Sequence, residues 1–106
     1  MKKIAYNAEK LKCVILRTDT AGCHIGFLKS CTPTNDHYDC ELINTRRIWE
    51  WDGAFSLSDL AWQGSKNHSG CKFSITLPEN RMMAIEIISV TEDALVDIDK
   101  IPVWLK

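Results

Sequence analysis

The sequence predicts a mainly β, α+β domain, built as a small curled antiparallel sheet or a partly open barrel with two short helices. Three observations support this fold class. Apolar runs that are β-branched or that alternate with polar residues recur between turn residues, which is typical of strands. Helix caps followed by apolar residues at helical spacing occur in only two places. The chain has 106 residues, enough for one core, so we expect a single domain over residues 1–106.

The N-terminal part of the chain predicts a β-hairpin. Residues 1–11 are polar and weakly patterned, and we expect a flexible arm or an edge element there. Residues 13–17 form a short β-branched run, which suits a strand buried on both faces. After a turn, residues 23–29 alternate, and Gly26 leaves room beside that strand for another backbone, a ring or a ligand.

The middle of the chain predicts further strands. Residues 30–37 have the composition of a polar loop. Residues 38–43 alternate and predict a third strand with one exposed face. Residues 45–51 continue as extended chain or as another strand, with arginine and tryptophan side chains on one side.

Two short segments predict helices. Residues 57–63 carry apolar residues at helical spacing, with Ser56 as the N-terminal cap and Gly64 as the C-terminal cap. Residues 92–99 have a similar apolar stripe, and a capping box beginning at Ser89 is expected to start this helix.

The remaining C-terminal segments predict three strands. Residues 71–77 alternate cleanly and indicate a half-buried strand, which a turn at 78–80 connects to an apolar central strand at 81–90. We expect these two strands to pair as a hairpin. Residues 101–105 end the chain as a short edge strand, whose exposed edge would allow a homo-oligomer.

Charge and hydropathy exclude several classes of function. The 13 Lys and Arg residues oppose 14 Asp and Glu residues, so no overall field attracts nucleic acid or a membrane surface, and neither is an expected partner. No window approaches the roughly 20 apolar residues of a membrane-spanning helix, and no apolar leader follows the first lysines. Five cysteines without an export signal predict reduced thiols. We therefore expect a cytoplasmic protein.

The candidate contact site is the cluster of Arg46, Arg47, Trp49 and Trp51. Arginine forks match phosphate or carboxylate oxygens, and tryptophan faces stack on bases or on cations. The same residue types dominate protein interfaces, so both a small anionic ligand and a protein partner are consistent with the cluster. The alternative is that one tryptophan packs in the core and the arginines pair with neighbouring carboxylates. Second-rank members of the predicted site are His24 and Arg17.

A second pattern concerns metal binding. His37 and Cys40 have the same spacing as His68 and Cys71, and four such ligands would suit tetrahedral zinc. The competing interpretation is that the two cysteines are buried inside strands as small apolar residues. We therefore predict no cofactor and keep zinc as an alternative.

No catalytic residue is assigned from the sequence. Cys23 and His24 are adjacent, so on a strand their side chains point to opposite faces and cannot form a nucleophile and base pair. The chain also lacks a glycine-rich phosphate loop, a nucleophile elbow and a metalloprotease helix motif. We expect a binding protein rather than an enzyme, with a small hydrolase or nuclease using His24, His68 or a metal as the alternative.

A resemblance to a known family rests on a combination of short motifs. These are residues 17–18 (RT), 21–26 (AGCHIG), 46–49 (RRIW) with Trp51, 53–54 (GA), 56–58 (SLS), 71–73 (CKF), 86–88 (EII) and 103–104 (VW). In this combination the sequence resembles a family of small proteins of unknown function found in tailed phages and prophages. The likeness covers residues 12–105.

The resemblance implies a biological setting rather than an activity. It implies a phage accessory protein in the host cytosol, which counteracts or modulates a host system, such as a defence system. It would do so by binding a host protein or by sequestering an anionic, nucleotide-like ligand, often as a symmetric homo-oligomer. A structural component of the virion is a further alternative.

Overall fold

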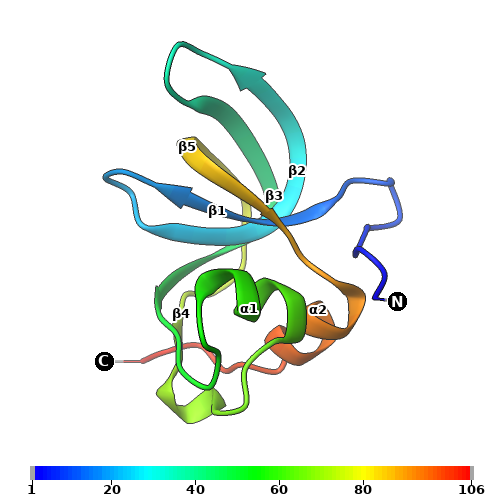
Figure 1. Cartoon of the computed structure of the whole chain (residues 1–106), viewed down its shortest axis with the longest axis vertical. Helices are drawn as coiled ribbons and strands as arrows, with labels where there is room; N and C mark the ends of the chain where they lie inside the picture. Colours follow the sequence, from blue (N-terminus) through cyan, green and yellow to red (C-terminus); the bar gives the residue numbers. More distant parts are fainter. Residues whose placement is uncertain (1, 106) are drawn as a thin grey trace.

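The computed structural model describes residues 2–105, so Met1 of the predicted arm and Lys106 lie outside the described residues. A five-stranded antiparallel sheet and two short helices make up the fold, which confirms the predicted fold class (Figure 1). No helix in the described range is long and apolar enough to span a membrane. The elements are β1 Cys13–Thr18, β2 Cys23–Pro33, β3 Tyr38–Glu50, α1 Leu57–Gln63, η1 His68–Gly70, β4 Lys72–Phe73, β5 Leu77–Ser89 and α2 Glu92–Ile98.

The four long strands close a ring of pairings. β1 pairs with β2 and β5, and β3 also pairs with β2 and β5, while the short β4 adds to the edge of β3. β5 closes the ring because its residues 77–84 pair with β3 and its residues 84–89 pair with β1. The sheet is therefore strongly curled, which agrees with the curled sheet of the predicted fold class.

One β-bulge shapes the middle of β3. Between the paired positions Phe27 with Ile43 and Ile25 with Arg46, β3 contains one residue more than β2. Asn44 takes up the extra residue with a positive φ of 50°. The strand runs through the bulge without a break, so the two strands predicted at 38–43 and 45–51 form one element.

Two apolar clusters lie on the two sides of β1. One lies between the sheet and the helices and contains Ile15, Leu60 and Phe73, whereas the other contains Leu16 and Leu42. Residues 13–16 are all buried, which confirms the prediction of a strand covered on both faces. In Figure 1, α1 and α2 lie together below the sheet, and the β2–β3 hairpin extends away from them.

The helices begin where side-chain caps occur. Ser56 Oγ accepts from the backbone N–H of Asp59 at 3.1 Å, and Gly64 ends α1 with a φ of 81°, so the bounds of α1 are as predicted. The second capping prediction was wrong. Ser89 is the last residue of β5, and the cap of α2 is Thr91, whose hydroxyl oxygen accepts from Ala94 N at 3.1 Å.

The C-terminal half differs most from the sequence prediction. The strand expected at 71–77 is reduced to β4, and the turn expected at 78–80 lies within β5, so the predicted hairpin between them does not form. Ser74 gives the reason, because its carbonyl accepts from Arg46 Nε at 2.8 Å and its hydroxyl accepts from Arg47 N at 2.7 Å. These bonds to β3 replace the regular pairing between β3 and β4 beyond Phe73. β4 therefore ends there, and the chain turns away from β3.

Strand lengths also differ at two other places. β2 extends to Pro33 into the expected polar loop, because residues 30–33 pair with the start of β3. The expected edge strand at 101–105 is a single parallel bridge between Val103 and Phe73.

Candidate functional site

The four residues of the predicted contact cluster point in different directions. Arg46 faces the interior and is only 8% exposed, and Trp51 packs against the apolar cluster between the sheet and the helices. Arg47 and Trp49 lie on the other side of β3, and Trp49 is 51% exposed. The structure therefore divides the cluster into an inner arginine and an outer surface.

Arg46 joins three parts of the chain. Its Nε donates to Ser74 O at 2.8 Å, and its Nη1 and Nη2 donate to Ile98 O and Pro102 O, each at 3.4 Å. The guanidinium also lies over the Phe73 ring, 5.0 Å from its centre. Burial lowers the pKa of Arg46, and the nearby negative charge of Asp99 opposes this effect.

Arg47 and His24 hold the turn between β1 and β2. Arg47 Nη2 donates to Ala21 O at 2.6 Å, and His24 Nε2 donates to the same oxygen at 2.8 Å. His24 is 4% exposed, and its pKa is lowered by burial first and by the charge of Arg47 as well. His24 is therefore a neutral donor beneath the turn rather than a group open to solvent.

The alternative pairing of the arginines with nearby carboxylates is not observed. Within residues 2–105, neither Arg46 nor Arg47 forms an ion pair. Glu50 pairs instead with Lys72 at 3.0 Å. Arg17 lies elsewhere, in an exposed ion pair with Glu86 at 2.8 Å on the neighbouring β5.

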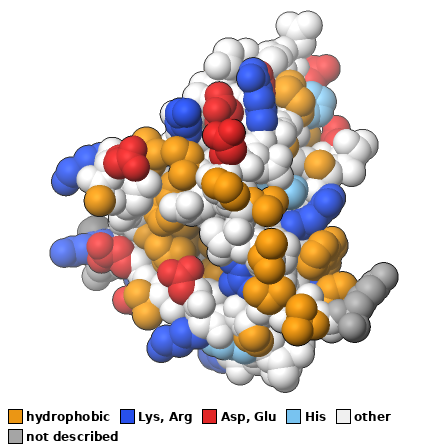
Figure 2. All heavy atoms as spheres, turned by 180° about the vertical axis from the view of Figure 1, so that it is seen from behind, with side chains coloured by type: hydrophobic (Ala, Val, Ile, Leu, Met, Phe, Trp, Pro, Cys, Tyr) orange, Lys and Arg blue, Asp and Glu red, His pale blue; other side chains and the backbone are white. Residues whose placement is uncertain are grey.

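An exposed tryptophan pair forms the outer surface. The rings of Trp49 and Trp104 meet edge to face with their centres 5.6 Å apart, and Lys72 Nζ lies 4.9 Å from the centre of the Trp104 ring. Trp104 N donates to Phe73 O, which holds the C-terminal segment against β4. We call Arg47, Trp49, Lys72 and Trp104 the tryptophan patch. Hydrophobic side chains also gather over the centre and lower right of the rear face (Figure 2).

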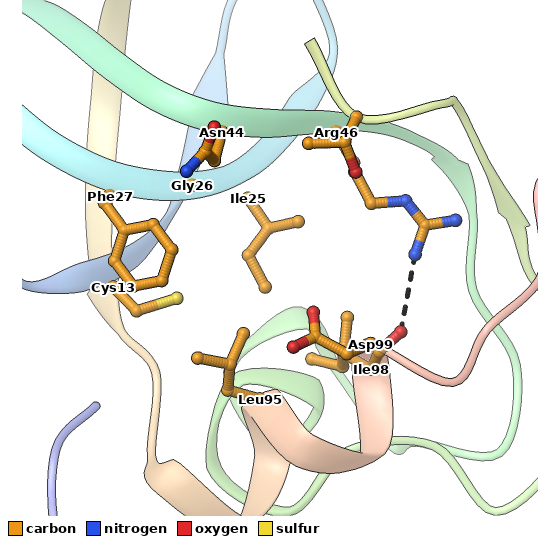
Figure 3. Close-up of a pocket in the computed structure, with 10 residues that line it drawn as sticks. Cys13, Ile25, Gly26, Phe27, Asn44, Arg46, Leu95, Ile98 and Asp99 are labelled. Atoms are coloured by element: carbon orange, nitrogen blue, oxygen red, sulfur yellow. Dashed lines mark hydrogen bonds between the residues drawn. The ribbon is translucent and has the colours of Figure 1, made fainter. Parts of the chain in front are cut away.

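A pocket of about 270 Å³ opens between the sheet and α2 (Figure 3). Its floor is formed by buried side chains, including Ile25 and Ile98, and Arg46 forms one end. Asn44 and Asp99 lie at its exposed rim. No sequence pattern singled out these two residues, although Gly26, which was expected to leave room beside its strand, lines the same pocket.

The four predicted zinc ligands are not brought together. His37 Nε2 lies 2.9 Å from Asp19, and the neighbouring Cys40 thiol faces another cysteine, both in the β2–β3 hairpin region. His68 Nε2 lies 3.0 Å from Asp97, near η1, and Cys71 is buried there. The described residues contain no group of three or more His, Cys, Asp or Glu side chains that could hold a metal ion.

The three histidine rings are hydrogen-bonded to carbonyl or carboxylate oxygens. In the part of the chain that the structure describes, each ring contacts an oxygen of Ala21, Asp19 or Asp97, and none is hydrogen-bonded to a cysteine thiol or a serine hydroxyl. The features available for contacts are therefore an exposed surface and a pocket.

Comparison with known proteins places this fold in a family. A family model described as a domain of unknown function, DUF6948, matches residues 11–98. The chain belongs to the DUF6948 family. The predicted membership of an uncharacterised family is thereby confirmed, and the DUF6948 match spans the sheet and both helices. Neither the curated proteins nor the solved structures contain a match to this chain.

Proposed function

We propose that this protein acts by binding another protein, as an accessory factor that a tailed phage uses in the host cytosol to counteract or modulate a host system. The phage setting rests on the sequence resemblance. One observation supports the binding role. Trp49 is half exposed and is held by Trp104, beside an Arg47 that forms no ion pair within residues 2–105.

The energetics of the tryptophan patch favour a protein partner. Burying the exposed part of Trp49 would remove apolar area from water at about 25 cal/mol per Å². The edge-to-face contact with Trp104 already restricts the ring, so little side-chain entropy remains to be lost on binding. Tryptophan and arginine are also the residues that most often dominate the binding energy of interfaces. The complementary partner surface would offer an apolar hollow with a carboxylate for Arg47.

Other functions have less support. The observation that favours a small nucleotide-like ligand is the pocket with Arg46 at its end. A hydrolase or nuclease that uses His24 or His68 has less support, because within residues 2–105 neither ring is hydrogen-bonded to a cysteine thiol or a serine hydroxyl. A virion component would be detected by finding the protein in purified particles.

The test is capture of partners from a lysate of the bacterial host with the wild-type protein and two variants. Trp49→Ala removes the centre of the tryptophan patch. Trp62→Ala is the matched control, because Trp62 is 45% exposed but lies on α1, outside the patch. We expect a partner that the control retains and Trp49→Ala loses, with at least about 2 kcal/mol of weaker binding once that partner is purified. Equal capture by both variants would remove the patch from the proposal.

A further inference from the structure

The pocket between the sheet and α2 has the dimensions of a small-ligand site. Its volume of about 270 Å³ lies just below the roughly 300–1,000 Å³ of pockets for drug-sized molecules. Its wall contains both polar and apolar side chains, and the apolar part has the Phe27 ring on one side and Leu95 on the other (Figure 3). An occupant would therefore be small, with an apolar or aromatic surface.

Two opposite charges face this small space. Arg46 has five N–H donors, of which three are directed to backbone carbonyls, so two remain. The carboxylate of Asp99 points toward the space between Ile25 and Leu95 in Figure 3. Within residues 2–105, it forms no ion pair, so its oxygens lie more than 4.0 Å from the guanidinium nitrogens of Arg46.

The separation of these charges defines the occupant. A ligand carboxylate would be repelled by Asp99, and a ligand ammonium group would be repelled by Arg46. A neutral ligand group with a carbonyl beside an N–H can bond to both charged side chains. Its oxygen accepts from the guanidinium of Arg46, and its N–H donates to the carboxylate of Asp99. This is the edge of a lactam.

We propose that this pocket binds a planar lactam of the guanine type. The guanine edge offers its carbonyl oxygen to Arg46 and two N–H groups to the carboxylate of Asp99, while the flat ring packs against Phe27 and the aliphatic walls. Adenine presents one donor instead of two to the carboxylate, so it binds more weakly. At the rim, Asn44 and Thr76 are exposed where a ribose would leave the pocket.

The inference specifies the nucleotide-like ligand that was the second candidate above, and it is independent of the tryptophan patch. The pocket and the patch share no residue. Loss of partner capture in Trp49→Ala therefore does not bear on the pocket, and a failure to bind guanosine does not bear on the patch.

The experiment is calorimetric titration of the full chain with guanosine and with adenosine. We expect one saturable guanosine site with a dissociation constant of about tens of micromolar, as the size of the ligand suggests, and at least about tenfold weaker binding of adenosine. Asp99→Asn replaces one accepting oxygen with an N–H₂ group and is expected to weaken guanosine binding at least about tenfold.

Asp93→Asn is the matched control. It makes the same chemical change in the exposed first turn of α2, outside the pocket, and should bind guanosine as the wild type does. Thermal unfolding of both variants checks that the fold is retained. The proposal is overturned if guanosine shows no saturable binding at millimolar concentration, if adenosine binds equally well, or if Asp99→Asn binds guanosine with unchanged affinity.

Discussion

Arg46 and Arg47 are neighbours in the sequence with different tasks in the structure. Alternation along β3 turns Arg46 inward, where it donates to three carbonyls, and turns Arg47 outward over the β1–β2 turn. Hydrogen bonds offset the cost of placing a charge in the interior, and Arg46 has three of them to backbone carbonyls.

This difference predicts unequal effects on stability. Arg46→Ala removes the side-chain donor from three carbonyls, of which Ile98 O keeps the backbone N–H of Ile101. It also opens space beside Phe73, so we expect a loss of about 3 kcal/mol in the free energy of unfolding. Arg47→Ala is the control and should cost about 1 kcal/mol, for one hydrogen bond. Urea unfolding of both variants measures the two values, and equal losses would contradict the inward role of Arg46.

His24 predicts a pH dependence of stability. Burial and the charge of Arg47 lower its folded-state pKa below the ordinary value of 6.5, so between these two values the unfolded chain binds more protons. Neutral His24 therefore contributes to the free energy of unfolding. This contribution is fully present above pH 6.5 and declines as pH falls through 6.5 toward the folded-state pKa. Arg47 on β3 is the charged group that faces the ring.

Comparison with His24→Gln isolates the effect, because glutamine keeps an N–H donor for Ala21 O and does not titrate in this range. Urea unfolding at pH 7.5 and pH 5.5 should show a larger loss of stability in the wild type than in the variant. All other ionisable groups are the same in both proteins, so their contribution to the pH dependence cancels in the difference. Equal losses would mean that burial of His24 does not disfavour its charged form.

At the scale of elements, the β2–β3 hairpin contains a pair of thiols that the sequence analysis did not pair. Cys31 and Cys40 are directly opposite in the ladder, and their Sγ atoms are 3.8 Å apart. Cys31 is exposed, whereas burial and the neighbouring thiol raise the pKa of Cys40 to about 12. Reduced thiols were expected from the composition, and this register places two of them within reach of a disulfide.

We expect oxidised glutathione to join these two cysteines. The Cys31 thiolate attacks the small disulfide and releases one glutathione thiol, and Cys40 then attacks the mixed disulfide at Cys31 and releases the second glutathione. The product is the protein less two hydrogen atoms, which intact mass spectrometry and peptide mapping detect. Cys31→Ser should abolish this product while Cys13→Ser retains it. Recovery of only mixed disulfides would contradict the expectation.

At the scale of the whole molecule, ring closure determines which distant segments meet. β5 passes from β3 to β1, and this path brings α2 beneath the sheet, where its last turn meets Arg46. The same arrangement places the segment after α2 against β4, so that Trp104 reaches Trp49. Both the pocket and the tryptophan patch thus depend on the position of the chain after β5.

A homo-oligomer remains a prediction at this scale. Val103 and Leu105 are exposed beside Trp104, so a second copy of the chain is an alternative occupant of the same surface. Native mass spectrometry reports the stoichiometry and any retained small molecule together. A dimer that Trp49→Ala dissociates would identify the second copy as the partner of the patch.

The sequence by itself determined the features that depend on neighbouring residues. The fold class, the buried strand at 13–16 and the bounds of α1 follow from alternation, β-branched runs and caps, which act over a few residues. The resemblance to an uncharacterised family likewise needed only short motifs. Arg46, Arg47 and Trp49 could be singled out by type, but not assigned to opposite sides of their strand.

Only the tertiary structure decided how these pieces meet. The bulge at Asn44 joined two predicted strands into β3, and the bonds from Ser74 to β3 shortened the strand that was expected to continue. The pocket needed Arg46 and Asp99, which lie far apart in the sequence and meet only after the ring closes. The physical reason is that the pattern within one strand indicates which of its faces is buried, whereas the choice of its partner strand and the path of the chain depend on long-range pairing.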